Sequence, residues 1–265
     1  MVNRGRILVD LGGSGTRVGR DLDGDTPKVT RTATTSLGEL VSLITAVEPK
    51  PIEVWISVAG TVSRRGSVIQ SYSLPWTAGE LGLRVSEAIS SRPEVSVVND
   101  GQAHAAPLLD LTPSALPGIG LALGSGVAFA CVNSKGTFSR RPDGGNFDIN
   151  GMPCPGQDSY IVPYCVGPAL GTAGWEKLMA LDLSRAAGRY SRVLADCLVG
   201  LSYLFGARTI FLSGGRLDSG AVDLDIVGQR LASCGLWAAP PNLVTGSGSM
   251  SAIEGLRLLS NRPFG

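Results

Sequence analysis

Apolar residues recur along this chain with two different spacings. Short apolar runs rich in β-branched residues and bounded by glycine or polar residues predict strands, and apolar residues at every third or fourth position predict helices. We therefore expect strands at residues 6–12, 16–22, 28–34, 52–60, 66–74, 95–100 and 208–215, a hairpin at 118–132, and helices at 36–47, 77–90, 101–111, 184–205, 222–235 and 247–260. Residues 140–166, rich in glycine and proline, are expected to form a long loop.

Two of these segments repeat one plan. ILVDLGGSGTRVG, residues 7–19, and GLALGSGVAFACV, residues 120–132, each combine an apolar strand, a glycine-rich turn and a returning strand. Glycine turns allow a ligand to approach the backbone closely, and successive N–H groups in such turns bind anions. One turn in each half of the chain indicates a two-lobed fold that holds a polyphosphate from both sides; two ordinary glycine hairpins are the alternative.

Composition and charge narrow the class of protein. With 265 residues, 43% of them hydrophobic, the chain can form one large domain or two smaller lobes. A net charge of +1 gives no electrostatic reason to expect nucleic acid or a membrane surface as a partner. The first apolar run is too short for a signal peptide, and no stretch reaches the ~18 apolar residues of a membrane span. The five cysteines, without a CxxC pair, indicate reduced thiols in a cytoplasmic protein rather than a disulfide set or a zinc site.

One carboxylate, Asp100 in VVNDGQAHAA, lies where an apolar strand gives way to a helix. An acid at this junction can cap the helix or accept a proton from a substrate, and the two roles are compatible. Asn99 offers both an amide donor and an acceptor to a neighbouring hydroxyl. The only histidine, His104, follows one helical turn later, where it could pair with Asp100 or pack locally.

Seven motifs together resemble a known family. VDLGGSGTR, ISVAG, SYSLPW, VVNDGQAHA, LALGSGVAFA, LSGGRL and SGSMSAIEGLRLL occur in the order found in the ROK-type sugar kinases of the actin, Hsp70 and hexokinase superfamily, and they span residues 7–259. The resemblance implies a two-lobed α/β fold, the actin-like ATPase fold with duplicated ribonuclease-H-like domains. The first lobe would comprise residues 1–108, with residues 248–265 packing back on it, and the second residues 109–247.

The same resemblance implies a nucleotide site. Asp10 would help to hold a hydrated Mg²⁺, a cation that prefers carboxylate and water oxygens; a turn-forming carboxylate is the alternative. The first turn would wrap the ATP phosphates, and Arg17 would add positive charge there. The second turn would bind the phosphates from the other half of the chain. A third segment would lie near the adenosine; a plain strand-to-helix turn is its alternative. These segments comprise Gly12, Gly13, Ser14, Gly15 and Thr16; Gly124, Ser125 and Gly126; and Ser213, Gly214 and Gly215.

The implied acceptor site departs from the family pattern. Asp100 would be the general base, with Asn99, Gly60 and Trp76 near the sugar, although Trp76 could equally pack in the core. The family's Glu-x-Gly-His stretch becomes PDGGNF, with Asp143 and Asn146 at the two functional positions, and the later glutamate becomes Val162. The cysteine-rich zinc loop is missing, so no structural zinc is expected. Since valine cannot pair with a hydroxyl, a deoxy sugar, an amino sugar or a cyclitol is as plausible as an aldohexose.

These observations predict ATP-dependent phosphorylation of a hydroxyl on a sugar-like small molecule, and family analogy adds a possible homodimer. Two alternatives stay open. A sugar-responsive transcription regulator would carry a helix-turn-helix before the first phosphate turn, and Asp10 leaves no room for one in this sequence. A catalytically worn sugar or nucleotide binder would keep the fold but lose turnover.

Overall fold

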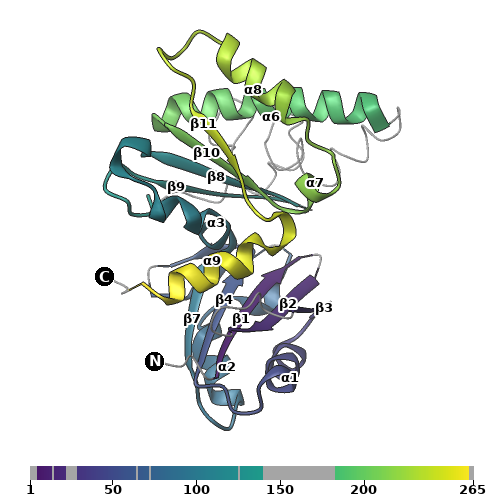
Figure 1. Ribbon diagram of the computed structural model, residues 1–265. Coiled ribbons are helices and arrows are strands. Elements are labelled where there is room, and N and C mark those ends of the chain that lie inside the picture. The colour runs from purple at the N-terminus through teal and green to yellow at the C-terminus, as the bar shows by residue number, and fades with distance from the viewer. Residues whose placement is uncertain are drawn as a thin grey trace. The chain divides into compact units, whose positions relative to one another are not determined.

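The computed structural model describes residues 5–13, 15–21, 29–63, 65–71, 73–124, 126–139 and 183–262 (Figure 1). Four predicted site residues, Ser14, Ser125, Asp143 and Asn146, lie outside these ranges, as does the loop expected at 140–166. The chain divides into two compact units. Unit 1 comprises Met1–Ala103 and Ala252–Gly265, and unit 2 comprises His104–Ser251.

Unit 1 is built on a five-stranded mixed sheet in the order β3-β2-β1-β4-β7. Antiparallel pairing joins β1 to β2 and β2 to β3, whereas β1, β4 and β7 run parallel. The strands are β1 (Arg6–Gly12), β2 (Gly15–Arg20), β3 (Val29–Thr32), β4 (Glu53–Val58) and β7 (Glu94–Asn99); β5 (Thr61–Val62) and β6 (Val68–Gln70) form a separate ribbon. Because β1, β4 and β7 are parallel, their carboxyl ends lie at one edge of the sheet.

One face of this sheet packs against α1 (Leu37–Val47) and α2 (Leu81–Ala88). Alternate residues of β1, namely Ile7, Val9 and Leu11, join Leu40 and Ile44 of α1 in the buried core of unit 1. Helix α2 begins later than the predicted residue 77, because Pro75–Thr77 form a separate 3₁₀ turn, η1.

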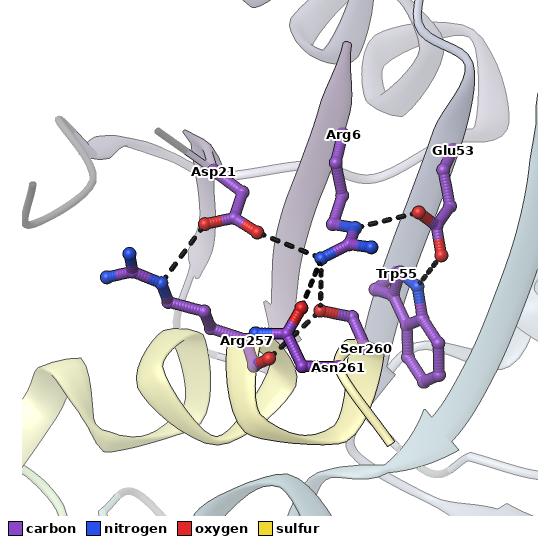
Figure 2. A network of polar contacts seen from close by, with 7 residues as sticks. All are labelled: Arg6, Asp21, Glu53, Trp55, Arg257, Ser260 and Asn261. Carbon is purple, nitrogen blue, oxygen red and sulfur yellow. Dashed lines mark hydrogen bonds and ion pairs between the residues drawn. The ribbon is translucent and has the colours of Figure 1, made fainter. Parts of the chain in front are cut away.

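Helix α9 (Ser251–Ser260) packs within unit 1, where a polar network connects it to the start of β1 (Figure 2). Arg6 donates from Nε to Glu53 Oε2 at 2.7 Å and from Nη1 to Ser260 Oγ at 3.0 Å and Asn261 Oδ1 at 2.9 Å. Asp21, only 1% exposed, pairs with both Arg6 Nη1 at 3.2 Å and Arg257 Nε at 3.1 Å. A buried carboxylate flanked by two guanidinium groups is compensated, so the network holds α9 against β1 and the end of β2.

Unit 2 is built on a four-stranded sheet in the order β11-β10-β8-β9. The strands β8 (Gly118–Leu123), β9 (Val127–Val132) and β10 (Thr209–Ser213) are fully buried, and β11 (Asn242–Thr245) is largely exposed. Helices α6 (Leu183–Phe205) and α8 (Leu224–Ser233) contribute to the core with these strands. The shorter elements are α3 (Asp100–Ala105), η2 (Ala106–Asp110), η3 (Pro113–Ala115), α7 (Gly215–Asp218) and η6 (Gly248–Met250).

The two sheets repeat one topology. In unit 1 the run β2-β1-β4-β7 consists of an antiparallel hairpin followed by two parallel strands, and in unit 2 the run β9-β8-β10-β11 has the same pairing. This duplication confirms the predicted α/β class with repeated ribonuclease-H-like halves. Among the described helices, none combines the length and apolar character needed to cross a membrane.

Candidate active site

The first glycine turn closes the β1–β2 hairpin of unit 1. Gly12 pairs with Gly15, so residues 13 and 14 alone form the loop. Gly15 has a φ of +149°, which glycine adopts readily. A side-chain carbon added to Gly13 would lie 2.7 Å from Ser73 Cβ, so the turn backbone packs too closely for any larger residue without rearrangement.

Asp10, two residues before this turn, is held by the strands on both sides. Its Oδ1 accepts a hydrogen bond from Ser57 Oγ at 2.9 Å, and its Oδ2 pairs with Arg17 Nη1 at 2.8 Å. The residue is 5% exposed. In the sheet register, Asp10 lies opposite Arg17 on β2 and Ser57 on β4. The charge of Arg17, expected to add to the phosphate site, is therefore engaged by Asp10.

The surroundings of Asp10 can be tested against a magnesium site. Each carboxylate oxygen has two acceptor directions, so one hydrogen bond to each still leaves capacity for a water of a hydrated cation. Within the described ranges, no group of three or more His, Cys, Asp or Glu side chains could hold a metal ion. Asp10 therefore fits the water-mediated contact that Mg²⁺ often keeps in proteins, better than it fits a cage of several carboxylates.

Thr16 has a buried side chain whose hydroxyl is hydrogen-bonded to the hydroxyl of Thr34. Because successive side chains of a strand point to opposite faces, Thr16 lies on the other face of β2 from Arg17. Its hydroxyl therefore supports the base of the hairpin, and no local pattern predicts a partner eighteen residues away.

Asn99 and Asp100 mark the passage from β7 to α3. Asn99 Oδ1 accepts from the Gln102 backbone N–H at 3.3 Å, and Gln102 Oε1 accepts from the Asn99 N–H at 3.4 Å. This reciprocal pair makes Asn99 the helix cap and Asp100 the first helical residue. Asp100 Oδ1 accepts from Asn99 Nδ2 and from the Gly101 N–H, both at 2.9 Å, so its carboxylate is oriented by its chain neighbours.

Gly60 and Trp76, the other predicted residues of the acceptor site, have different environments. Gly60 accepts a 2.7 Å hydrogen bond from Asn99 Nδ2, and a side-chain carbon on it would lie 2.4 Å from Gln70 O. Gly60 therefore brings the end of β4 close to β6 and supports Asn99. Trp76 packs against the core of unit 1, and its buried Nε1 has no hydrogen-bond partner among the described residues.

In unit 2, three glycine-rich segments lie together. The Gly124 N–H donates to Gly126 O at 3.0 Å and closes the second turn. A side-chain carbon on Gly214, whose φ is +99°, would lie 2.5 Å from Leu123 O, at the base of that turn. The Gly214 N–H donates to Gly248 O at 3.0 Å. Gly215, which begins α7, follows directly.

Ser213 and His104 form a contact that the sequence did not predict. The hydroxyl of Ser213, a fully buried residue, lies 3.0 Å from His104 Nδ1. The sequence left His104 between pairing with Asp100 and packing locally; this contact instead links α3 to β10. Ser57 was also missed, although a serine inside the apolar run of β4 was a usable signal.

Comparisons with known proteins agree on the fold. No protein-family model matches this sequence, and no curated protein does. Among solved structures, a ROK family glucokinase from Streptomyces griseus in complex with glucose and AMPPNP has a TM-score of 0.70 at 17% identity, covering 96% of this chain and 98% of that chain. An inorganic polyphosphate/ATP-glucomannokinase from Arthrobacter has a TM-score of 0.68 at 14% identity, covering 97% and 98%.

A structure with a different role has the same fold. A ROK family transcriptional regulator, described as a homologue of the E. coli MLC protein, has a TM-score of 0.70 at 14% identity, covering 97% of this chain and 79% of that chain. At these identities the likeness establishes the fold. The chain therefore has the actin-like ATPase fold found in ROK-family sugar kinases and regulators, as the order of its motifs predicted.

Proposed function

We propose that this protein is a ROK-family phosphotransferase that transfers a phosphoryl group from ATP to a hydroxyl of a sugar or sugar-like molecule. One observation carries the proposal: Asp10 and Asp100 stand at the carboxyl ends of β1 and β7, with only β4 between them. Neighbouring strands lie ~4.8 Å apart, so the two backbones are separated by about 10 Å. Ligands of open α/β sheets bind at such carboxyl ends.

Asp100 is the proposed general base. The acceptor hydroxyl oxygen attacks the γ-phosphorus, the bond from that phosphorus to the bridging oxygen breaks, ADP leaves, and the hydroxyl proton passes to the Asp100 carboxylate. Phosphoryl transfer depends mainly on positioning and charge neutralisation, so a single oriented carboxylate suffices as the base. The contacts from Asn99 Nδ2 and the Gly101 N–H support this role, because they fix the carboxylate at the end of β7.

The proposed nucleotide contacts follow the glycine segments and Asp10. A Mg²⁺ ion near Asp10 would supply positive charge to the phosphates. Backbone N–H groups of the two glycine turns would contact phosphate oxygens, with Gly214 and Gly215 towards the adenosine. The glucokinase with AMPPNP and the polyphosphate/ATP enzyme among the similar structures support a phosphoryl donor of this kind.

The acceptor is proposed as an aldohexose, an amino sugar, a deoxy sugar or a cyclitol. The support comes from the sequence PDGGNF, which replaces a family glutamate and histidine by Asp143 and Asn146, and from Val162 in place of a later glutamate. Asp143 and Asn146 can still form hydrogen bonds, but valine cannot pair with the hydroxyl that the later glutamate would hold, so the site loses one reason to select glucose.

The test is a panel of these four acceptor classes incubated with ATP and Mg²⁺, with ADP release as the readout. A second arm replaces ATP by polyphosphate and measures the phosphorylated acceptor instead. Asp100→Asn should lower turnover by about 10³-fold while nucleotide affinity stays near that of the wild type, because base catalysis contributes on the order of 10²–10⁴. The matched control is Asp110→Asn, which changes an exposed carboxylate at the end of η2. ADP release that no acceptor stimulates would instead favour the regulator or the worn binder.

A further inference from the structure

Arg31 is an exposed residue of β3 in unit 1. It lies on β3, where the register sets it directly opposite Arg17 of β2. Arg17 is in turn opposite Asp10, and Asp10 is opposite Ser57. Residues that face each other across paired strands lie on the same face of a sheet. Arg31, Arg17, Asp10 and Ser57 therefore form one row across four strands.

The charges along this row do not balance. Arg17 is paired with Asp10 at 2.8 Å, and its side chain is 18% exposed. Arg31 is exposed and has no ion pair with a carboxylate of the described residues. Two guanidinium groups and one carboxylate thus leave a net positive charge at the Arg31 end of the row.

Arg31 also lies over the first glycine turn. A side-chain carbon added to Gly15 would come within 3.3 Å of Arg31 Nε and 3.8 Å of Arg31 Cγ. The space above Gly15 is therefore taken by the arginine side chain, and the missing side chain at Gly15 makes room for it. A positive group is thus held beside the backbone that the proposed function assigns to phosphate.

We propose that Arg31 binds the β- and γ-phosphates of the nucleotide at the first glycine turn. The proposal rests on the proposed function, since it requires a phosphate chain at that turn. A guanidinium group can donate two parallel hydrogen bonds to phosphate oxygens, which gives both charge and orientation. Arg17 is less suited to this task, because its Nη1 is paired with Asp10, which neutralises part of its charge. Arg31 thus adds side-chain recognition to a turn that otherwise offers backbone donors.

The test compares the affinities of ATP, ADP and AMP at constant Mg²⁺ by calorimetry. We expect Arg31→Gln to weaken ATP about tenfold, ADP less and AMP not at all, and Arg31→Lys to lie between it and the wild type. The wild type should also lose more ATP affinity with added salt than Arg31→Gln does, because the lost contact is ionic. Arg92→Gln is the matched control: it removes an exposed arginine before β7, whose first residue is in register with Glu53 at the far end of the sheet. Thermal unfolding checks that each variant is folded.

The outcomes separate this proposal from the function on which it rests. Equal ATP affinity for the wild type and Arg31→Gln, or a loss that is the same for AMP and ATP, overturns the role of Arg31 and leaves the proposed kinase intact. Absence of nucleotide binding by the wild type overturns both. An Arg92→Gln variant as weak as Arg31→Gln also overturns the specific contact, because the effect would then be one of net charge.

Discussion

The two units share a topology but differ in the layer of residues just before each glycine turn. In unit 1 this layer is charged: Asp10 lies opposite Arg17. In unit 2 the corresponding cross-strand pair is Ala122 and Ala128, two small apolar residues that are 6% and 7% exposed. The same backbone plan thus supports an ion pair in one unit and plain packing in the other. The duplicated fold therefore supplies a glycine turn in each unit, whereas the charged pair before the turn is present in unit 1 only.

The serines of the next strand extend the contrast. Ser57 is in register with Asp10, and Ser213 is in register with Ala122. Ser57 donates to the carboxylate, but Ser213 has an alanine beside it and its hydroxyl instead contacts His104. One position in the repeated sheet therefore orients an acid in unit 1 and joins a helix to the sheet in unit 2.

The largest loss of stability is expected when an acid is placed at the corresponding position of unit 2. Ala122→Asp would bury a carboxylate without its partner, and we expect the free energy of unfolding to fall by about 3–5 kcal/mol. The double variant Ala122→Asp, Ala128→Arg copies the pair of unit 1 and should recover part of the loss. Urea unfolding measures both. If Ala122→Asp were as stable as the wild type, water would have to reach position 122, contrary to its burial in the structure.

Removing the negative charge of Asp10 tests the same difference between the units in unit 1. Asp10→Asn keeps an acceptor for Ser57 but loses the ion pair with Arg17 and the proposed charge near Mg²⁺. We expect kcat/KM for phosphoryl transfer to fall about 10²-fold, which corresponds to ~2.7 kcal/mol. Steady-state kinetics with varied Mg²⁺ measures the effect.

The matched control for Asp10→Asn is Asp196→Asn. It also breaks a 2.8 Å pair with an arginine, Arg230, but on the exposed surface of unit 2. Surface pairs contribute little, so its activity and stability should stay near those of the wild type. Equal kinetic losses in the two variants would contradict a special role for Asp10.

The two serines at the corresponding positions, Ser57 and Ser213, should differ by a smaller amount. Ser57→Ala removes a hydrogen bond to a charged group, for which ~1.5–3 kcal/mol of stability is typical, and Ser213→Ala removes one between neutral groups, for which ~0.5–1.5 kcal/mol is typical. Urea unfolding of both variants is measured at pH 8, where imidazole groups in general are mostly neutral. A larger loss for Ser213→Ala would contradict the expectation that the hydrogen bond to the Asp10 carboxylate is the stronger of the two.

The sequence predicted the strands and turns that have strong local signals. The β-branched runs of β1, β4 and β7 and the glycines between β1 and β2 specify their structure within a few residues. Strand β11 was missed because it has only four residues, follows two prolines and is mostly exposed, so it shows no apolar pattern. The start of α2 was misjudged because Pro75 begins a separate turn.

The side-chain partners of the candidate site were harder to predict, because they depend on register and on distant segments. The pair between Asp10 and Arg17 follows from a hairpin loop of only two residues, and a loop one residue longer would have turned Arg17 to the other face. The contact between His104 and Ser213 joins residues 109 positions apart. No local pattern encodes such a pairing. Asn99 took the capping role that the sequence had offered to Asp100, because Gln102 completes the reciprocal bonds.

The network around Arg6 has a consequence for how the chain is made. Arg6 is hydrogen-bonded to Asn261, 255 residues later, so the first strand and a late helix close the same unit. Domains tend to fold as the chain emerges from the ribosome. Residues 104–251 can therefore form their sheet before α9, which unit 1 requires, has been synthesised. The half that is synthesised first is therefore the half that matures last.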